Sequence, residues 1–443
     1  MAPSDTGPQE PGAPGTGPPG AGPGATGQEA GQEAGQEAGR EAGQDPDRPV
    51  RAYLDHAATT PMVPEAVEAM LPYLVEVFGN PSGGHLESRR ARRAVDDARQ
   101  GVATSFGVDL GDVIFTGSGT EADNLAVVGG WESRVGSGVG NGNGNGGGRR
   151  PPVLVCSAME HHAVLTTCRS LARRTGAELR EVGTGKDGLV DLDALAEACT
   201  PDVVLVSVMA VNNEIGTIQP LEQVASIVRT GSPGALVHAD AVQAVPWLET
   251  VSLATWADLV SISGHKFGGP KGVGALVVAP GVAIGPHIHG GGQERDRRSG
   301  THNVAGIVAM AAALSVTETE RPATVARVGA QRDRLGDGIL ASVPGTVETG
   351  DRYHRVAGSL HLRFAGVEAE ALVILLDQAG LSVSAGAACS SGAVEVSHVL
   401  TSMGLPPEEA ASGIRLSLGA TTTDADIDHA LAVVPGAVGQ LRD

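Results

Sequence analysis

The stretch DLVSISGHKFGGPKGVGALVV, residues 258–278, holds two of the three lysines in the chain, Lys266 and Lys271. The third is Lys186, so arginine supplies nearly all of the 31 Lys plus Arg residues. Arginine keeps its proton, whereas a lysine amine can lose one and condense with a carbonyl. The stretch is typical of two buried strands around a glycine-rich turn, and it raises the question whether Lys266 is a Schiff-base lysine.

Short apolar runs rich in β-branched residues recur on both sides of this stretch and alternate with amphipathic runs such as PLEQVASIVRT. Such alternation predicts a mostly parallel sheet with helices on both faces. After Gly300 a long alanine-rich stretch predicts a helix, and a second set of strands and helices follows, ending in a helix from about Asp424. The predicted strands of the first set are residues 112–117, 152–158, 203–211, 235–242, 258–263 and 274–280.

Length and composition are those of a globular protein with two domains: 443 residues, 41% of them hydrophobic. No apolar run reaches the length of a membrane span, and the N-terminus lacks the order of a signal peptide, so we expect a cytoplasmic location. Four cysteines without CxxC spacing, Cys156, Cys168, Cys199 and Cys389, argue against a disulfide framework and a structural zinc site. Any cysteine chemistry would come from a single thiol.

The formal charge of -20 is partly a property of the first segment, in which eight acids against two arginines up to Arg48 leave -14 for the rest. This balance disfavours nonspecific binding to nucleic acid or anionic lipid. Residues 1–49, rich in Pro and Gly and then repeating GQEA, are predicted to be a disordered tail. A Gly/Asn-rich insertion at about residues 136–152 is predicted to be a flexible surface loop.

Polar residues follow several predicted strands. FTGSGTEADNLAV predicts a strand, a turn and a helix that begins near Gly119 and Thr120, a place suited to a phosphate or simply to a helix cap. Asp240, with Gln243 just beyond it, ends the strand LVHADAV; it could hold a ring nitrogen protonated or could cap a helix. Ser263 and His265 stand beside Lys266 at the end of the next strand.

Two further motifs close other strands. His161, in MEHHAVL, could stack on an aromatic cofactor or simply pack; adjacent histidines lack the i, i+4 spacing of a helical metal site, so no metal is predicted. Asn213, in VNNEIGTIQP, could bond a ligand or form a turn. A phosphate cradle, a strand-end Asp, a stacking His and a rare Lys at successive strand ends together describe a pyridoxal 5'-phosphate pocket.

The order of the motifs YLDHAATTP, FGNPSGGH, FTGSGTEADNLA, VNNEIGTIQP, HADAVQ, SGHKFGGPKGVG, GGGQERDRRSGT, GAACSSG and IRLSLG resembles that of the cysteine desulfurases, in their NifS/IscS-like branch. These are class V aminotransferases among the fold-type I pyridoxal-phosphate enzymes. The resemblance covers nearly all of the chain from Tyr53. It implies a large domain at 50–315, with a mostly parallel seven-stranded sheet between helices, and a smaller α+β domain at 316–443.

The resemblance also implies roles. Lys266 would form the Schiff base with the cofactor, Asp240 would pair with the ring nitrogen, and His161 would stack on the ring. Arg415, in IRLSLG, would grip the substrate carboxylate, for which a guanidinium fork is suited, and Asn213 would contact both cofactor and substrate. The other implied cofactor contacts are Gly119, Thr120, Gln243, Ser263, His265 and Thr301, the last reaching the phosphate of the partner subunit in a homodimer.

Cys389 lies among small residues in SVSAGAACSSGAVEVSHVL, where a lone cysteine could be a buried hydrophobe. In the enzymes that the chain resembles, this cysteine takes the sulfur of L-cysteine, leaving alanine and a persulfide. The implied partners are a sulfur-acceptor protein, either an iron–sulfur scaffold or a tRNA-thiolation enzyme, and an iron–sulfur cluster held transiently near Cys389. The alternatives are a selenocysteine lyase, another class V lyase or aminotransferase, or an inactive interaction protein.

Overall fold

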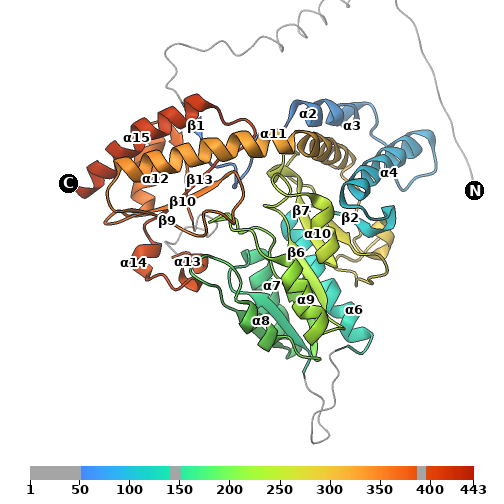
Figure 1. Cartoon of the computed structure of the whole chain (residues 1–443). Coiled ribbons are helices and arrows are strands. Elements are labelled where there is room, and N and C mark those ends of the chain that lie inside the picture. Colours follow the sequence, from blue (N-terminus) through green and yellow to red (C-terminus); the bar gives the residue numbers. More distant parts are fainter. Residues whose placement is uncertain (1–50, 140–150, 387–395) are drawn as a thin grey trace, which may run out of the picture. The chain divides into compact units, whose positions relative to one another are not determined.

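The computed structural model describes residues 51–139, 151–386 and 396–443. The predicted tail and most of the Gly/Asn insertion lie outside these residues. The described residues contain a seven-stranded, a four-stranded and a two-stranded sheet (Figure 1).

The seven-stranded sheet has the order β2-β8-β7-β6-β5-β3-β4. Strand β8 runs antiparallel to β2 and β7, and the pairs from β7 to β4 are parallel, which confirms a mostly parallel sheet. Six strands were predicted; β4, partly exposed at the sheet edge, was not. The bounds are β2 Val113–Thr116, β3 Val153–Ser157, β4 Glu178–Val182, β5 Val203–Ser207, β6 Leu236–Asp240, β7 Leu259–Ser263 and β8 Gly274–Val278.

Apolar side chains on both faces of these strands account for their continuous hydrophobic runs. Leu154 packs into the core on one face of β3, and its neighbour Val155 packs into the core on the other. Leu205 and Val206 divide in the same way on β5. Burying a side chain of this size contributes about 1.5–3 kcal/mol, so both faces must be covered.

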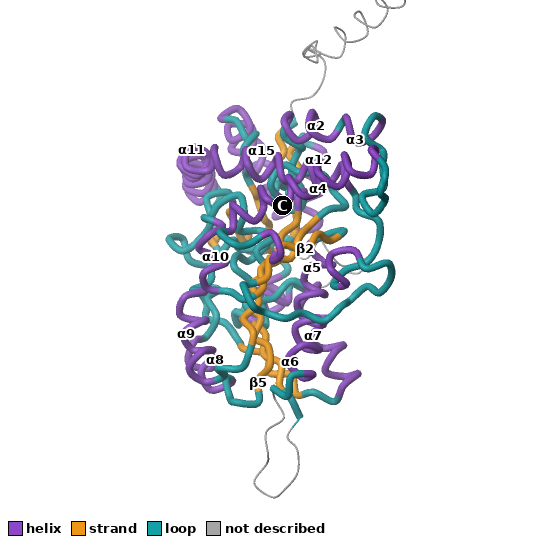
Figure 2. The backbone as a smooth tube through the Cα atoms, turned by 90° about the vertical axis from the view of Figure 1, so that its right-hand side faces the viewer, coloured by secondary structure: helices purple, strands orange, loops and turns teal. Residues whose placement is uncertain are grey.

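Helices cover both faces. Figure 2 views the sheet along its edge, with α8, α9 and α10 on one side and α5, α6 and α7 on the other. The helix that starts with α5 continues through a π-helical segment, Leu125–Gly129, into α6. The bounds are α5 Gly119–Asn124, α6 Gly130–Gly136, α7 His162–Thr175, α8 Leu192–Ala198, α9 Leu221–Gly231 and α10 Thr250–Trp256.

A second core lies around the four-stranded sheet, whose order is β12-β13-β10-β9 with antiparallel pairing. Leu360, Leu362, Ile414 and Leu416 are at most 1% exposed within it. The bounds are β9 Thr346–Glu348, β10 Ser359–Phe364, β12 Ser384–Ala385, β13 Gly413–Ser417, α12 Ala369–Gln378, α13 His398–Ser402, α14 Pro407–Ala410 and α15 Asp424–Arg442.

The N-terminal part of the described chain reaches this second core. Strand β1, Ala52–Tyr53, pairs in parallel with β11, Leu381–Ser382. The predicted alanine-rich helix is α11, Val304–Ser342, which packs against α2, α4 and α15. The remaining helices are α2 Pro64–Met70, α3 Pro72–Val75 and α4 Leu86–Phe106, with short 3-10 turns η1 Leu110–Asp112, η3 Gly264–Lys266 and η4 Gln293–Asp296. Among the described residues, no helix has the length and apolar character needed to cross a bilayer.

Candidate active site

A cavity of about 430 Å³ lies where the strands of the large sheet end. Asp240 and Ser263 are the last residues of β6 and β7, and Gly119 is the first residue of α5. The structure therefore gathers most predicted site residues around one space, as open α/β sheets do at their carboxyl edge. Its lining includes Gly119, Thr120, His161, Asn213, Asp240, Gln243, Ser263, His265, Lys266 and Arg415.

Lys266 ends the 3-10 turn that follows β7. Its Nζ donates to the carbonyl of Ala57 at 2.5 Å and to that of Ala58 at 3.0 Å. Gln243 Nε2 donates to the same Ala57 carbonyl at 2.8 Å. The segment YLDHAATTP therefore holds the Lys266 amine through main-chain oxygens. The alanine side chains make none of these contacts.

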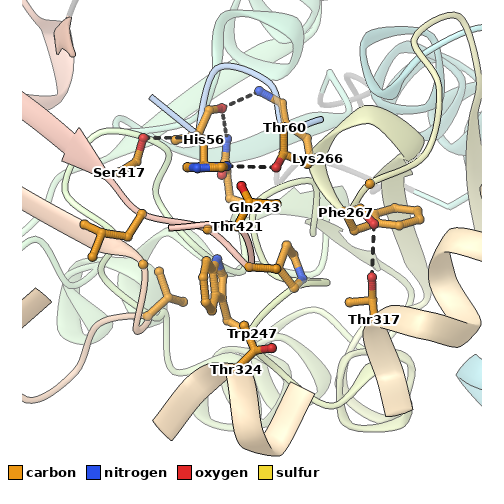
Figure 3. A pocket seen from close by; sticks show the side chains of 18 of the residues that line it. His56, Thr60, Gln243, Trp247, Lys266, Phe267, Thr317, Thr324, Ser417 and Thr421 are labelled. Atoms are coloured by element: carbon orange, nitrogen blue, oxygen red, sulfur yellow. Dashed lines mark hydrogen bonds between the residues drawn. The ribbon is translucent and has the colours of Figure 1, made fainter. Parts of the chain in front are cut away.

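A second cavity of about 150 Å³ shares Ala57, Asn213, Gln243 and Lys266 with the first. Figure 3 shows Lys266 and Gln243 near His56 and Thr60, with Trp247 and Phe267 among the apolar side chains. His56 Nδ1 lies 2.8 Å from Thr60 Oγ1, and burial lowers the pKa of His56 to about 4. His56 is therefore a neutral side chain that braces the segment holding Lys266.

Asp240 is 4% exposed and accepts the Val242 N–H at 2.9 Å. Burial raises its pKa to about 6, although that N–H and the charge of Lys266 act in the opposite direction. A cationic N–H donor stabilises the ionised form of a buried carboxyl group whose pKa is raised in this way. The site thus suits a ligand that brings such a donor to Asp240.

Three buried ionisable groups near Asp240 were not predicted from the sequence: Asp123, Glu160 and His238. Burial, and then the charge of Asp240, raises the pKa of Asp123; burial also raises that of Glu160. Burial lowers the pKa of His238 to about 3, and its ring nitrogens lie 2.8 Å from Ser207 Oγ and 3.0 Å from Ser261 Oγ.

Asp123 and Asp240 therefore repel each other when both are ionised, and a cationic donor at Asp240 would relieve that repulsion. The sequence held a sign that Asp123 lies near the site: it follows Thr120 by three positions and so lies on the same face of the helix.

The turn before α5 has the features of an anion cradle. Ser118 caps the helix by accepting the Glu121 N–H at 3.1 Å. A Cβ on Gly119 would come within 2.7 Å of Val242 and 3.0 Å of Ser263, so glycine permits the turn to lie directly against the ends of β6 and β7. Unpaired N–H groups and the helix dipole attract negative charge at such a place.

His161 and His265 are both neutral at pH 7. Burial, and then the charge of Lys266, lowers the pKa of each to about 4. His161 caps α7, and its Nδ1 accepts the Ala163 N–H at 3.1 Å, which assigns the ring proton to Nε2. His265 Nδ1 lies 3.2 Å from Thr59 Oγ1. His161 can therefore donate a hydrogen bond through Nε2.

The ligand atoms of Asp123, His161 and Asp240 lie within 4.8 Å of one another. The His161 ring therefore lies beside the two buried carboxyl groups, and all three side chains line the same cavity. Such a trio could hold a cation, a role that a pyridinium N–H or a metal ion could fill.

Arg415, on β13, is buried and lines the same cavity. Its Nη2 donates to Asp55 Oδ1 at 2.7 Å and its Nη1 to the Asn213 carbonyl at 2.9 Å, while Nε has no partner in the described part of the chain. Asp55 and Arg415 are 360 positions apart. The guanidinium is therefore held by two of its five N–H donors, one on each terminal nitrogen.

A second buried group beside Arg415 was also missed. Glu214 accepts the Ser397 hydroxyl at 2.5 Å, and burial raises its pKa to about 7. His361 is fully buried, with a pKa lowered to about 3 by burial, and neither ring nitrogen has a partner among the described residues. A Cβ on Gly386 would lie 2.8 Å from Glu214 Oε2 and 3.5 Å from His361 Nε2. A histidine inside the apolar run SLHLRFAG was the available signal.

Two predicted residues remain to be placed. Thr301 is exposed and does not line it. Cys389 lies at 387–395, outside the described residues.

Comparison with known proteins agrees with this geometry. The aminotransferase class-V family model matches residues 52–430. An IscS-like cysteine desulfurase from Mycobacterium tuberculosis is 44% identical over 395 residues, covering 88% of this chain and 97% of that protein. A solved NifS-like protein superimposes with a TM-score of 0.79 at 32% identity, covering 88% of this chain and 100% of its own. A structure described as SspA in complex with cysteine gives 0.70 at 28%, covering 84% and 100%.

Fold, site and family match together define a class V aminotransferase of fold type I. Within that class, the chain belongs to the cysteine desulfurase family, as its motifs predicted.

Proposed function

We propose that this protein is a cysteine desulfurase that uses pyridoxal 5'-phosphate to remove sulfur from L-cysteine, releases L-alanine and passes the sulfur through Cys389 to an acceptor. The observation that carries the proposal is the meeting of Lys266, Asp240, His161 and Arg415 at one cavity. The names of the relatives and the cysteine bound in the SspA structure support the substrate.

The residues present fit the cofactor. Asp240 offers a buried carboxylate to a ring N–H, and the close packing of Gly119 leaves main-chain donors at the start of α5 for a phosphate. We assign the phosphate to Thr120, Ser263 and His265, the ring face to His161, and the ring hydroxyl side to Asn213 and Gln243. Lys266 would hold the cofactor through its amine. When bound, the cofactor supplies an electron sink for the bonds at the substrate α-carbon.

Lys266 and His161 are the two groups that would bind or move protons in this site. The Ala57 and Ala58 carbonyls hold the Lys266 amine at the cavity. His161 stays neutral and presents Nε2–H. We infer that His161 donates a hydrogen bond to the substrate side of the cavity and that the uncharged ring keeps this wall suited to stacking.

Arg415 would orient the substrate. Its fork is already aimed by Asp55 and the Asn213 carbonyl. A substrate carboxylate can bond the remaining Nη hydrogens or displace Asp55, and bidentate pairing of this kind fixes direction as well as affinity.

Cys389 would accept the sulfur. Its thiolate forms a bond to the substrate sulfur while the carbon–sulfur bond breaks; that electron pair remains with the substrate carbon, which gains a proton to become the alanine methyl group. Only the thiolate attacks efficiently, and an ordinary thiol pKa of about 8.5 leaves most of it protonated at neutral pH. Positioning of the thiol, or a neighbouring base, must therefore contribute.

We further propose a homodimer, because Thr301 is exposed and absent from the cavity of its own chain. A mixture of Lys266→Ala and Thr301→Val chains tests this: exchange between dimers should regenerate one intact site, and a mixture no more active than its parts would contradict it. The division into domains at 50–315 and 316–443 stays a prediction, with its boundary inside α11. The acceptor would be an iron–sulfur scaffold or a tRNA-thiolation enzyme.

The test of function is the visible absorption of the purified protein, followed by alanine and sulfide assays with L-cysteine and with L-selenocysteine. The proposal expects a yellow protein that forms alanine from L-cysteine. Turnover of L-selenocysteine alone would instead make it a selenocysteine lyase, and a colourless protein that does not take up pyridoxal phosphate would contradict the proposal.

A further inference from the structure

The segment of residues 291–302, just before α11, has an unusual backbone. Glu294, Arg295 and Asp296 have φ angles of 49°, 57° and 64°, and no other non-glycine residue in the described part of the chain has a positive φ. Side chains with a Cβ disfavour this left-handed region. Such strain persists only where the surroundings impose it, and it gathers at functional sites.

Glu294 is the residue that the surroundings hold. Its carboxylate accepts Arg99 Nη1 at 2.7 Å and Nη2 at 2.6 Å, the Phe115 N–H at 3.2 Å and His302 Nε2 at 2.7 Å. These donors come from α4, from β2 and from the end of the segment itself. A single 8%-exposed carboxylate thus ties the segment to two elements of the large sheet domain.

The charge on this carboxylate is secure. Burial alone would raise the pKa of Glu294, but hydrogen bonds from His302 and Arg99 outweigh burial and lower it to about 2. Glu294 is therefore ionised at neutral pH. An ionised acceptor makes stronger hydrogen bonds than a neutral one.

A second pair fixes the segment next to the phosphate cradle. Arg298 Nε donates to Glu121 Oε1 at 2.6 Å, and Glu121 Oε2 accepts the Gly117 N–H at 2.9 Å. Glu121 directly follows Thr120. The segment is therefore attached to the turn before α5, and it places Thr301 between two anchored residues, Arg298 and His302.

We propose that Glu294 is a positioning residue, which holds residues 291–302 in the left-handed shape that presents Thr301 to the cofactor phosphate bound by a second copy of this chain. The inference rests on the proposed function. Glu294 does not line the cofactor cavity, so it acts through Thr301 and not as a catalytic residue. Its loss should weaken cofactor binding more than it slows turnover.

The test is Glu294→Gln in the full chain, purified with pyridoxal phosphate. Glutamine keeps the size of the side chain but turns an NH₂ donor toward the donors of Arg99. We expect the dissociation constant for pyridoxal phosphate to rise about tenfold, the equivalent of one charge-assisted hydrogen bond. At saturating cofactor, kcat should fall less than the affinity does, and amide hydrogen exchange should accelerate within 291–302 even without cofactor.

Two further variants keep the test decisive. Glu181→Gln breaks another Arg–Glu fork, a more exposed one between α7 and β4 with Arg169 at 2.7 Å from both oxygens; it should change neither cofactor affinity nor exchange in the segment. Arg99→Lys keeps the positive charge but loses the fork, so it should weaken cofactor binding in the same direction by a smaller factor. It serves if Glu294→Gln does not fold.

The inference is overturned if Glu294→Gln and Arg99→Lys bind pyridoxal phosphate as tightly as the wild type, or if exchange rises uniformly through the chain and not in 291–302. Failure of the wild type itself to bind pyridoxal phosphate would instead overturn the proposed function.

Discussion

Replacing Arg415 with lysine should separate substrate binding from cofactor binding. The side chain is 7% exposed and holds Asp55 and the Asn213 carbonyl with two different nitrogens. Lysine keeps the positive charge beside Asp55, so this partly buried acid does not lose its counter-ion. It has one nitrogen, however, and cannot hold both anchors and a substrate carboxylate in a planar fork.

The size of the effect follows from the lost contact. A hydrogen bond to a charged group contributes about 1.5–3 kcal/mol, and each 1.4 kcal/mol corresponds to about a tenfold change. We therefore expect kcat/KM for L-cysteine to fall between about 10-fold and 100-fold in Arg415→Lys. The affinity for pyridoxal phosphate should change less than kcat/KM, because Arg415 bonds none of the residues assigned to the phosphate, the ring nitrogen or the ring face.

The assay measures kcat and KM from alanine formation and measures cofactor affinity by visible absorption. Arg363→Lys is the matched control, because Arg363 lies on the neighbouring strand β10 and bonds Thr349 Oγ1 at 3.1 Å and Glu409, away from the cavity. The control should leave kcat/KM within about twofold of wild type. Arg415→Lys with wild-type kcat/KM, or with cofactor loss as large as its activity loss, would refute the assigned role.

Three other outcomes are expected. Lys266→Ala and Lys266→Arg should both lose the visible absorption of the cofactor adduct, because neither side chain can condense with a carbonyl; an unchanged spectrum in either would remove Lys266 from its role. Deleting residues 1–48 should leave turnover of L-cysteine nearly intact, since a Pro/Gly/GQEA segment has little apolar surface to bury; a large loss of cofactor or activity would show that the segment belongs to the enzyme. Glu214→Gln should become more stable than the wild type as pH rises. Burial raises the Glu214 pKa from 4.5 to about 7, so its contribution to stability is full below about pH 4.5 and is lost as pH rises through about 7, on the order of 3 kcal/mol by pH 8. A gain in Tm that is the same at pH 5 and pH 8 would contradict this reading.

The sequence predicted the parts of the site that depend on local pattern. The strands ending at Asp240 and Ser263 are mostly apolar and fully buried, and the residue after such a run lies at the sheet edge wherever the strand is placed. Those patterns are enough to put Gly119, Asp240 and Lys266 near one another. They do not define β4, because its half-exposed side chains lack the continuous apolar run of a buried strand.

The remaining features depend on contacts between distant residues. The Asp55–Arg415 pair joins positions 360 apart, and no local pattern specifies it. Lys266 is held by the main chain of Ala57 and Ala58, which leaves no trace in side-chain identity. The raised pKa of Glu214 is caused by burial that only the fold creates. Glu294 has a left-handed backbone conformation, and local backbone preference would predict glycine at such a position.

The measurement that tests the central claim most directly is mass spectrometry of the peptide containing Cys389 after the loaded enzyme has reacted with L-cysteine without an acceptor. The account predicts one added sulfur atom on Cys389, alanine formed in step with it, and neither product in Cys389→Ser, which should still bind the cofactor and change its spectrum with L-cysteine. Serine is a far poorer nucleophile toward sulfur. Wild-type alanine formation by Cys389→Ser, with no persulfide on the wild-type peptide, would contradict the account and favour a lyase that eliminates sulfur without a cysteine.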